Sequence, residues 1–226
     1  MEVKEMLAHP SNFTKGRKQK IQYIVVHYTA NNGDTAEGNG KYFSGADRNT
    51  SAHYFVDEIK IVRSVFDKDT AWHCGAKIYR HKKCRNENSI GVEMCSKKDS
   101  NGQYYINQKT QNNAAELVKW LMKKYDIPIE NVLRHYDVTG KLCPEPFAKN
   151  QKLWLDFKQK LLQSKEVKKE MLYNYIDENM PAWARPTIQK LVDKGALQGN
   201  EKGELLLTDV MLRIFVANDR AGAYDK

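Results

Sequence analysis

The sequence IQYIVVHY (residues 21–28) is a run of β-branched and aromatic residues, which predicts a buried central strand. NSIGVEMC (88–95) predicts a second strand and NVLRHY (131–136) a short third one that ends near its histidine. Between them, apolar residues recur at helical spacing over 108–125 and predict an amphipathic helix. Strands that alternate with helices over 1–163 predict an α/β domain with a central, mostly mixed β-sheet flanked by helices.

Shorter elements complete this first domain. SAHYFVD (51–57) and KIVRSVF (60–66) predict a β-hairpin. Helix-start chemistry predicts a short helix that begins at Asp34 or Thr35, in spite of two internal glycines. A last helix is expected at about 149–163.

The composition changes after a charged link, SKEVKKE (164–170), and residues 171–226 predict a small all-α domain. Its three predicted helical segments are MLYNYIDEN (171–179), WARPTIQKLVDKG (183–195) and LTDVMLRIFVANDRAG (207–222). The side chains expected to form its core are Trp183, Ile188, Leu191, Leu197 and Leu212.

Composition excludes several classes of protein. With 41% hydrophobic and 29% charged residues, the 226-residue chain has the composition of a globular protein, and no apolar run approaches the roughly 20 residues of a membrane span. The N-terminus has no apolar signal-peptide core, so we expect cytoplasmic synthesis without Sec export. Four cysteines without a CxxC pair exclude a disulfide scaffold and a zinc ribbon.

The net charge of +9 is concentrated in residues 1–165, which carry +10. This excess indicates either an anionic partner or a role in solubility alone. The chain has no RNP, zinc-finger or helix-turn-helix signature, so we expect no nucleic-acid partner. An acidic cell-wall polymer and a membrane surface stay open as partners.

Three residues have the chemistry of a zinc site. His27 ends the first predicted strand, His135 ends a later one, and Cys143 follows His135 by eight positions. Two imidazoles and a thiolate suit Zn²⁺, and three protein ligands leave a fourth position for water, as in catalytic sites. Spacing alone leaves open the alternative that one histidine is a packing group and Cys143 a small hydrophobic residue.

Two further residues are candidates for catalysis. Strand alternation places Glu93 on the face opposite Val92, where burial would raise its pKa toward that of a general base. A solvent-facing glutamate on a half-exposed sheet is the alternative. Lys141 lies two residues before Cys143, so a metal held there would have its ammonium nearby to stabilise an oxyanion. Without a metal, Lys141 would be a solvated surface charge.

Five blocks of the sequence, in order over about residues 18–163, resemble the zinc N-acetylmuramoyl-L-alanine amidases of the type-2 family. This family includes phage endolysins, prophage lysins, bacterial autolysins and, more distantly, the animal peptidoglycan recognition proteins. The blocks are VVHYTA (25–30), SAHYFV (51–56), AWHCG (71–75), NSIGVEM (88–94) and RHYDVTGKLCPEPF (134–147).

The resemblance implies a role for each matching position. The implied Zn²⁺ ligands are His27, His135 and Cys143, and the implied catalytic residues are Glu93 and Lys141. The positions that line the family's substrate groove are Trp72, His73 and Asn88. The implied reaction is hydrolysis of the amide bond between the lactyl group of N-acetylmuramic acid and L-Ala of peptidoglycan.

The sequence departs from one branch of the family. Coliphage-type lysozymes have a tyrosine where Ala52 stands here, and they lack the strand glutamate. The chain therefore resembles the glutamate-dependent branch, and Tyr54 is not expected to be catalytic. Cys74 and Cys84 lie ten residues apart and would either pair in an oxidising medium or remain reduced thiols inside a cell.

The resemblance favours a phage or prophage endolysin that acts on the peptidoglycan of a Gram-positive cell wall after release through a holin or by lysis. One alternative is a non-catalytic peptidoglycan-binding module. Another is a cysteine hydrolase with Cys143 as nucleophile and His135 as base, which Pro144 disfavours because it removes a backbone N–H from the oxyanion site. PAWARPTIQKLVDKGALQG (181–199) is faintly similar to wall-binding repeats, so the C-terminal domain is expected to bind the wall or to form a homodimer.

Overall fold

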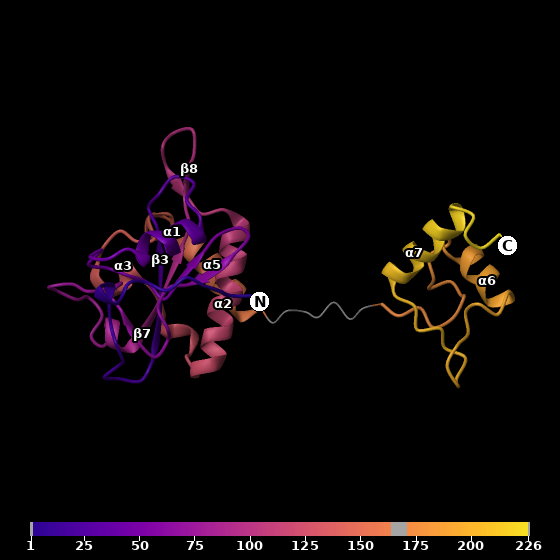
Figure 1. Cartoon of the computed structure of the whole chain (residues 1–226), viewed down its shortest axis with the longest axis horizontal. Helices are drawn as coiled ribbons and strands as arrows, with labels where there is room; N and C mark the ends of the chain where they lie inside the picture. The colour runs from indigo at the N-terminus through magenta and orange to yellow at the C-terminus, as the bar shows by residue number, and fades with distance from the viewer. Residues whose placement is uncertain (1, 164–170, 226) are drawn as a thin grey trace. The chain divides into compact units, whose positions relative to one another are not determined.

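The computed structural model describes residues 2–163 and 171–225. The chain divides into two compact units, residues 1–163 and 164–226 (Figure 1). The expected link at 164–170 lies outside the described residues.

The first unit contains a central mixed sheet, as the sequence predicts, and it has one strand more than the five predicted, β1 (Lys4–Glu5) at the N-terminus. Its strands, in spatial order, are β1, β5 (Ile61–Arg63), β4 (Tyr54–Val56), β7 (Ser89–Met94), β3 (Tyr23–Tyr28) and β10 (Val132–Arg134). Neighbouring strands are parallel except β4 and β5, which form the predicted antiparallel hairpin. The IQYIVVHY segment supplies β3, which lies between β7 and β10.

The remaining elements surround this sheet. Two small antiparallel ribbons pair β2 (Phe13–Thr14) with β6 (Thr70–Ala71) and β8 (Lys97–Lys98) with β9 (Tyr104–Tyr105). The α-helices of this unit are α1 (Ala36–Ser44), α2 (Gln108–Tyr125), α3 (His135–Thr139), α4 (Glu145–Lys149) and α5 (Gln151–Leu162). Three short 3₁₀ helices span Pro10–Asn12, Asn86–Asn88 and Ile129–Asn131. In the part of the chain that the structure describes, no helix is long and apolar enough to cross a membrane.

The two faces of the sheet carry different side chains, because successive residues of a strand point to opposite faces. On one face, Ile24 and Val92 pack with Leu117 of α2 and Phe157 of α5 in the main hydrophobic core. The other face carries the odd-numbered residues of β3 and β7 and holds two smaller apolar clusters, one with Val138 of α3 and one with Ala36 of α1. The main core therefore anchors the strands, and the opposite face combines apolar packing with polar groups such as His27 and Glu93.

Two boundaries differ from the sequence prediction. The expected strand through His135 ends at Arg134, and His135 is the first residue of α3. The cause is a local cap, in which the Asp137 carboxylate accepts a 2.8 Å hydrogen bond from the backbone N–H of Arg134. The expected helix over about 149–163 is confirmed as α5, but it begins at Gln151, because the Asn150 side chain caps it; α4 is an additional short helix before it.

Over the described residues 171–225, the second unit contains two packed helices, α6 (Arg185–Asp193) and α7 (Asp209–Arg220). The side chain of Thr208 caps α7. The expected first helix at 171–179 is wrong, because Tyr173 instead forms an isolated antiparallel bridge with Leu207. Of the expected core residues, Ile188, Leu191 and Leu212 are buried and Leu197 packs against them.

Trp183 is the error in the predicted core of the second unit. Its side chain is 41% exposed and lies beneath the guanidinium of Arg213, 5.5 Å from the ring centroid. Helical periodicity alone does not distinguish a core tryptophan from one that stacks on a surface cation.

Candidate metal centre

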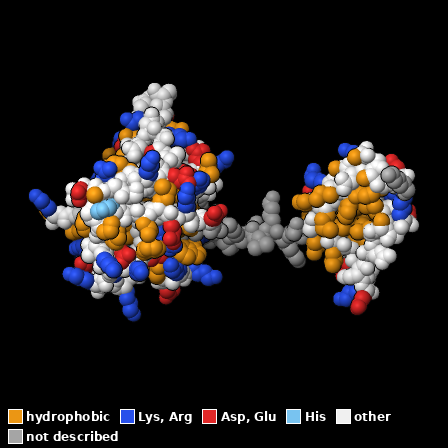
Figure 2. All heavy atoms as spheres, in the orientation of Figure 1, with side chains coloured by type: hydrophobic (Ala, Val, Ile, Leu, Met, Phe, Trp, Pro, Cys, Tyr) orange, Lys and Arg blue, Asp and Glu red, His pale blue; other side chains and the backbone are white. Residues whose placement is uncertain are grey.

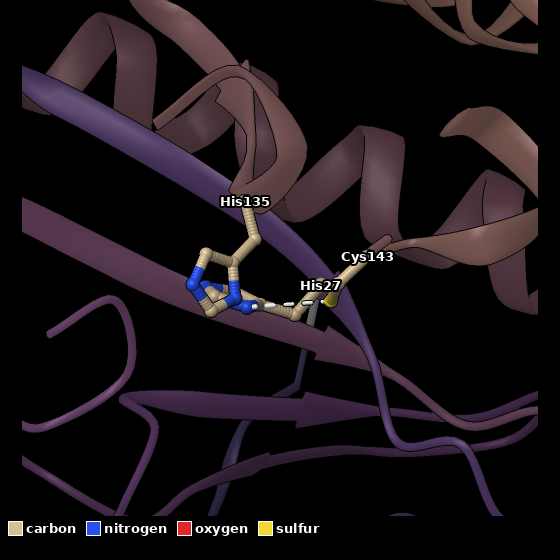
Figure 3. A group of neighbouring side chains, drawn as sticks. All are labelled: His27, His135 and Cys143. Carbon is tan, nitrogen blue, oxygen red and sulfur yellow. Dashed lines mark hydrogen bonds between the residues drawn. The ribbon is translucent and has the colours of Figure 1, made fainter. Parts of the chain in front are cut away.

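Three side chains from separate elements converge on the face of the sheet opposite the main core (Figure 3). His27 lies near the end of β3, His135 opens α3, and Cys143 lies in the loop after α3. Their potential ligand atoms all lie within 4.8 Å of one another, and all three residues are buried. The Nδ1 atom of His27 is 3.7 Å from the Sγ atom of Cys143.

A tight reversal of the chain brings Cys143 back beside His135. Helix α3 stops at Gly140, whose φ of +86° is readily accessible to glycine. The Gly140 N–H donates to the Tyr136 carbonyl at 2.9 Å, and the Tyr136 N–H donates to the Cys143 carbonyl at 2.8 Å. The eight-residue spacing seen in the sequence is therefore the length of one short helix and its return loop.

Glu93 lies next to His27 because the two residues are direct partners in the parallel pairing of β3 and β7. Its Oε1 atom is 3.8 Å from His27 Nδ1, and its buried Oε2 atom has no hydrogen-bond partner among the described residues. Burial raises the pKa of Glu93 to about 8, and the nearby charge of Lys141 opposes this rise. The predicted strand alternation at Glu93 is thus confirmed.

Burial also determines the protonation of the three convergent residues. It lowers the pKa of His27 well below its usual value and the pKa of His135 to about 4, so both imidazoles are neutral at pH 7. Neutral imidazoles are the form that binds metals. Burial raises the pKa of the Cys143 thiol to about 12, so without a metal this residue is not a thiolate.

Two pockets open beside this centre. The first, about 420 Å³, is lined in part by Trp72, His135 and Thr139. The second, about 640 Å³, is lined in part by Glu93 and Cys143 and also by Asn31, Asp34, Tyr42 and Phe55. Lys141 is exposed and borders both pockets. His135 lines the first pocket and Cys143 lines the second, so both pockets reach the convergent residues.

The three expected groove residues have different surroundings. Trp72 is half-buried and borders the first pocket, and its indole N–H donates to Thr14. His73 borders the same pocket, but both of its ring nitrogens are already hydrogen-bonded to protein side chains, at 3.0 Å to His27 and 3.1 Å to Ser89. Contact of a His73 nitrogen with substrate would therefore require one of these bonds to break.

Asn88 stabilises a turn and does not line either of these two pockets. It is 2% exposed, and its side chain accepts a hydrogen bond from the Arg85 N–H and donates to the Lys83 carbonyl. These bonds close the 3₁₀ turn that precedes β7. The expectation that Asn88 lines the groove is therefore not met in this structure.

Other residues clarify the sequence expectations. Tyr54 is buried in the main core and donates a 2.6 Å hydrogen bond to Asp67, which agrees with a structural role. Cys74 and Cys84 are both buried free thiols in one apolar cluster. Sequence reasoning missed Thr139 at the first pocket, because nothing in the sequence marks a residue that only tertiary folding brings there.

The comparisons with known proteins agree with this geometry. The family model described as N-acetylmuramoyl-L-alanine amidase matches residues 17–146, more than half of the chain. The amidase CwlL of Bacillus licheniformis is 37% identical over 161 residues, which cover 66% of this chain and 44% of the relative. The amidase BlyA of Bacillus subtilis is 30% identical over 200 residues, which cover 83% of this chain and 51% of the relative.

Solved structures show the same fold. The structure of PlyL matches with a TM-score of 0.61 and 34% identity, covering 74% of this chain and all of that one. The catalytic domain of XlyA matches with a TM-score of 0.60 and 28% identity, covering 71% and 99%. This chain spans about half the length of the curated relatives that it matches. The chain belongs to the N-acetylmuramoyl-L-alanine amidase family.

Proposed function

We propose that this protein is a zinc-dependent N-acetylmuramoyl-L-alanine amidase that hydrolyses the lactyl–L-Ala amide bond of peptidoglycan. The observation that carries the proposal is the convergence of His27, His135 and Cys143 within 4.8 Å, with the Glu93 carboxylate 3.8 Å from the first of them. The family and the names of the relatives support the same reaction. The conclusion therefore rests on site geometry and on family membership together.

The residues present fit a zinc ion. Two neutral imidazoles and one cysteine are a preferred donor set for Zn²⁺, and three ligands leave an open position for chemistry. Buried His135 Nδ1 has no hydrogen-bond partner among the described residues, which suits an atom reserved for a metal. When bound, zinc supplies Lewis acidity that activates water and polarises the amide carbonyl. It also favours the thiolate form of Cys143.

The chain's own groups then move the protons and stabilise the charge. Glu93 takes a proton from the attacking water and returns it to the nitrogen of the leaving L-Ala. A divalent cation beside His27 would lower the pKa of Glu93 from its value of about 8, so that the carboxylate form is available near neutral pH. Lys141, which borders both pockets, stabilises the oxyanion of the tetrahedral intermediate.

The two rival functions have less support. A cysteine hydrolase needs a reactive thiolate, whereas burial raises the pKa of Cys143 to about 12. Pro144 also cannot supply a backbone N–H to an oxyanion. A non-catalytic binding module has no need for a catalytic carboxylate, whereas Glu93 lies half-buried beside the ligand set and lines the second pocket. The amidase accounts for both features.

We place the action of this enzyme at the cell wall of a Gram-positive bacterium, as a phage or prophage endolysin freed by a holin or by lysis. The relatives CwlL and BlyA come from Bacillus, and one similar structure, with 29% identity and a TM-score of 0.59, is named a mutant endolysin from Bacillus subtilis. The net charge of +10 over residues 1–165 favours approach to an anionic wall.

The reaction can be tested with soluble N-acetylmuramoyl-peptides, which need no binding to the wall. We expect the full chain to release N-acetylmuramic acid and a peptide with a free L-Ala amino terminus, both identified by mass spectrometry. Intact substrate, or cleavage within the stem peptide, would contradict the proposed reaction.

We propose that the second unit holds the enzyme on the wall. The match to BlyA covers 83% of this chain, which is more than the 163 residues of the first unit. The match therefore extends into the second unit. An apolar area lies on the visible face of this unit (Figure 2). The large exposed apolar residues of the unit are Met171, Leu172, Tyr175, Trp183, Leu206, Val210, Met211 and Ile214. Exposed apolar area of this kind indicates an interaction surface, for the wall or for a second copy of the chain.

Deletion of residues 164–226 should separate binding from chemistry. The first unit has its own hydrophobic core and contains every proposed ligand and catalytic residue, so hydrolysis of soluble muropeptides should change by less than about threefold. Sedimentation with purified walls should fall by more than about tenfold. Undiminished wall binding by the truncated protein would contradict the targeting role. A full chain that elutes as a dimer and a truncated one that elutes as a monomer would favour the homodimer instead.

A further inference from the structure

A chain of hydrogen bonds leads from the far side of His27 into the protein interior. The Nε2 atom of His27 lies 3.0 Å from Nδ1 of His73, and the Nε2 atom of His73 lies 3.1 Å from the Ser89 hydroxyl. The Ser89 hydroxyl donates to the backbone carbonyl of Arg85 at 2.6 Å. His27, His73 and Ser89 are all buried, so water does not compete for these bonds.

The last acceptor, the Arg85 carbonyl, sets the donor-to-acceptor direction of every hydrogen bond in this series. A carbonyl oxygen carries no proton, so the single hydroxyl proton of Ser89 must go to Arg85. The Ser89 oxygen then accepts from His73 Nε2–H, which leaves His73 Nδ1 as an acceptor for His27 Nε2–H. Neutral His27 is thereby left with an unprotonated Nδ1, the atom that faces Cys143 and Glu93.

We propose that His73 is a positioning residue which, through Ser89 and the Arg85 carbonyl, holds His27 in the tautomer whose Nδ1 is free to bind the metal. This inference rests on the proposed zinc site and adds to it a tautomer-setting partner outside the ligand set. The opposite tautomer would require Ser89 to donate to His73 and to lose its bond to Arg85. The Cys74 thiol, 3.9 Å from the Ser89 oxygen, does not change this direction because a hydroxyl oxygen accepts more than one bond.

The packing around His73 holds its ring in the position from which it hydrogen-bonds to both His27 and Ser89. The ring lies directly over Gly91 of β7, and a Cβ atom at this position would lie 2.6 Å from the His73 ring carbon Cγ. Gly91 pairs with Val25 in the register that also pairs Glu93 with His27. Gly91, two residues before Glu93 on the same face of β7, therefore leaves space for the His73 ring beside the metal centre. Any larger residue at this position would displace the His73 ring.

Three variants and one control separate this role from simple packing. His73→Leu removes both ring nitrogens, Ser89→Ala removes the hydroxyl, and His73→Asn retains an oxygen near the Nδ1 position. Ser64→Ala is the matched control, because Ser64 is 1% exposed and its hydroxyl has no hydrogen-bond partner among the described residues. Each full-length variant is titrated with zinc against a chromophoric chelator, and its thermal unfolding is measured without metal.

We expect His73→Leu to raise the zinc Kd by about 10- to 100-fold, the usual effect of losing the partner of a metal-bound histidine. Ser89→Ala should raise it by a smaller factor, His73→Asn should recover part of the loss, and Ser64→Ala should match the wild type. A wild-type zinc Kd in both His73→Leu and Ser89→Ala, with only their metal-free unfolding temperatures lowered, would overturn the proposal in favour of a packing role.

The tautomer itself can be observed without zinc, from the ring ¹⁵N chemical shifts of His27 in the metal-free full chain. We expect a proton on Nε2 alone in the wild type and in Ser64→Ala, and a mixture of tautomers in Ser89→Ala. A wild-type proton on Nδ1 would overturn the proposal. A wild type with the expected tautomer but no zinc binding would support the role of His73 in setting the tautomer and overturn the zinc amidase. Failure of the tautomer proposal and failure of the proposed function are therefore distinguishable.

Discussion

Replacing Glu93 with glutamine should lower kcat on peptidoglycan by about 10²- to 10⁴-fold, the range expected when a general acid–base group is lost. Glutamine has nearly the same shape as glutamate, but its amide cannot accept the proton of the attacking water. The ligand set is untouched, because Glu93 is a neighbour of His27 and is not one of the three convergent donors. Zinc content should therefore equal that of the wild type.

Glu130→Gln is a suitable control for this variant, because Glu130 is exposed and lies in the short 3₁₀ helix before β10. It removes the same charge away from both pockets and should leave kcat unchanged. Wild-type turnover by Glu93→Gln, with normal zinc content, would remove this carboxylate from the mechanism.

Cys143→Ser should weaken zinc binding by more than about 100-fold, since losing a ligand costs more than losing a ligand's partner. A serine hydroxyl does not replace a thiolate, which zinc favours strongly. Activity at low zinc should be lost, and a large excess of zinc should restore only part of it. Metal content after gel filtration and activity across a zinc titration measure the two effects.

Cys95→Ser provides the matched control, because Cys95 is also a buried free cysteine but lies outside the ligand set. Its zinc affinity should equal that of the wild type, even if its thermal stability falls. If Cys143→Ser retained one tightly bound zinc per chain, the assignment of Cys143 as a ligand would be wrong.

The sequence predicted the sheet well because hydrophobic patterning reports directly on burial. The β3 run and the alternation around Glu93 specify which residues face the apolar core, and the structure confirms both. His135 was misplaced because a local cap by Asp137 ends β10 at Arg134, and strand patterning carries no signal for such a cap. The error does not move His135 from the ligand cluster, since the start of α3 lies at the same edge of the sheet.

Other parts of the site depend on tertiary contacts that no local pattern encodes. The resemblance implied a groove position for His73, but only the folded chain shows its two hydrogen bonds to His27 and Ser89. Asn88 similarly proves to close a turn before β7. Motif matching identified these positions, and the side-chain partners that determine their roles become visible only when distant segments meet.

The most direct test of the zinc amidase is digestion of purified Bacillus sacculi by the full chain, with chelator, without chelator and with zinc added back. Mass spectrometry of the soluble products distinguishes the outcomes. We predict free stem peptides that begin with L-Ala, beside uncleaved glycan strands, whenever zinc is present and never while it is chelated. Release of the same peptides at an undiminished rate by chelated, zinc-free protein would contradict the account, as would wall binding with no released peptide.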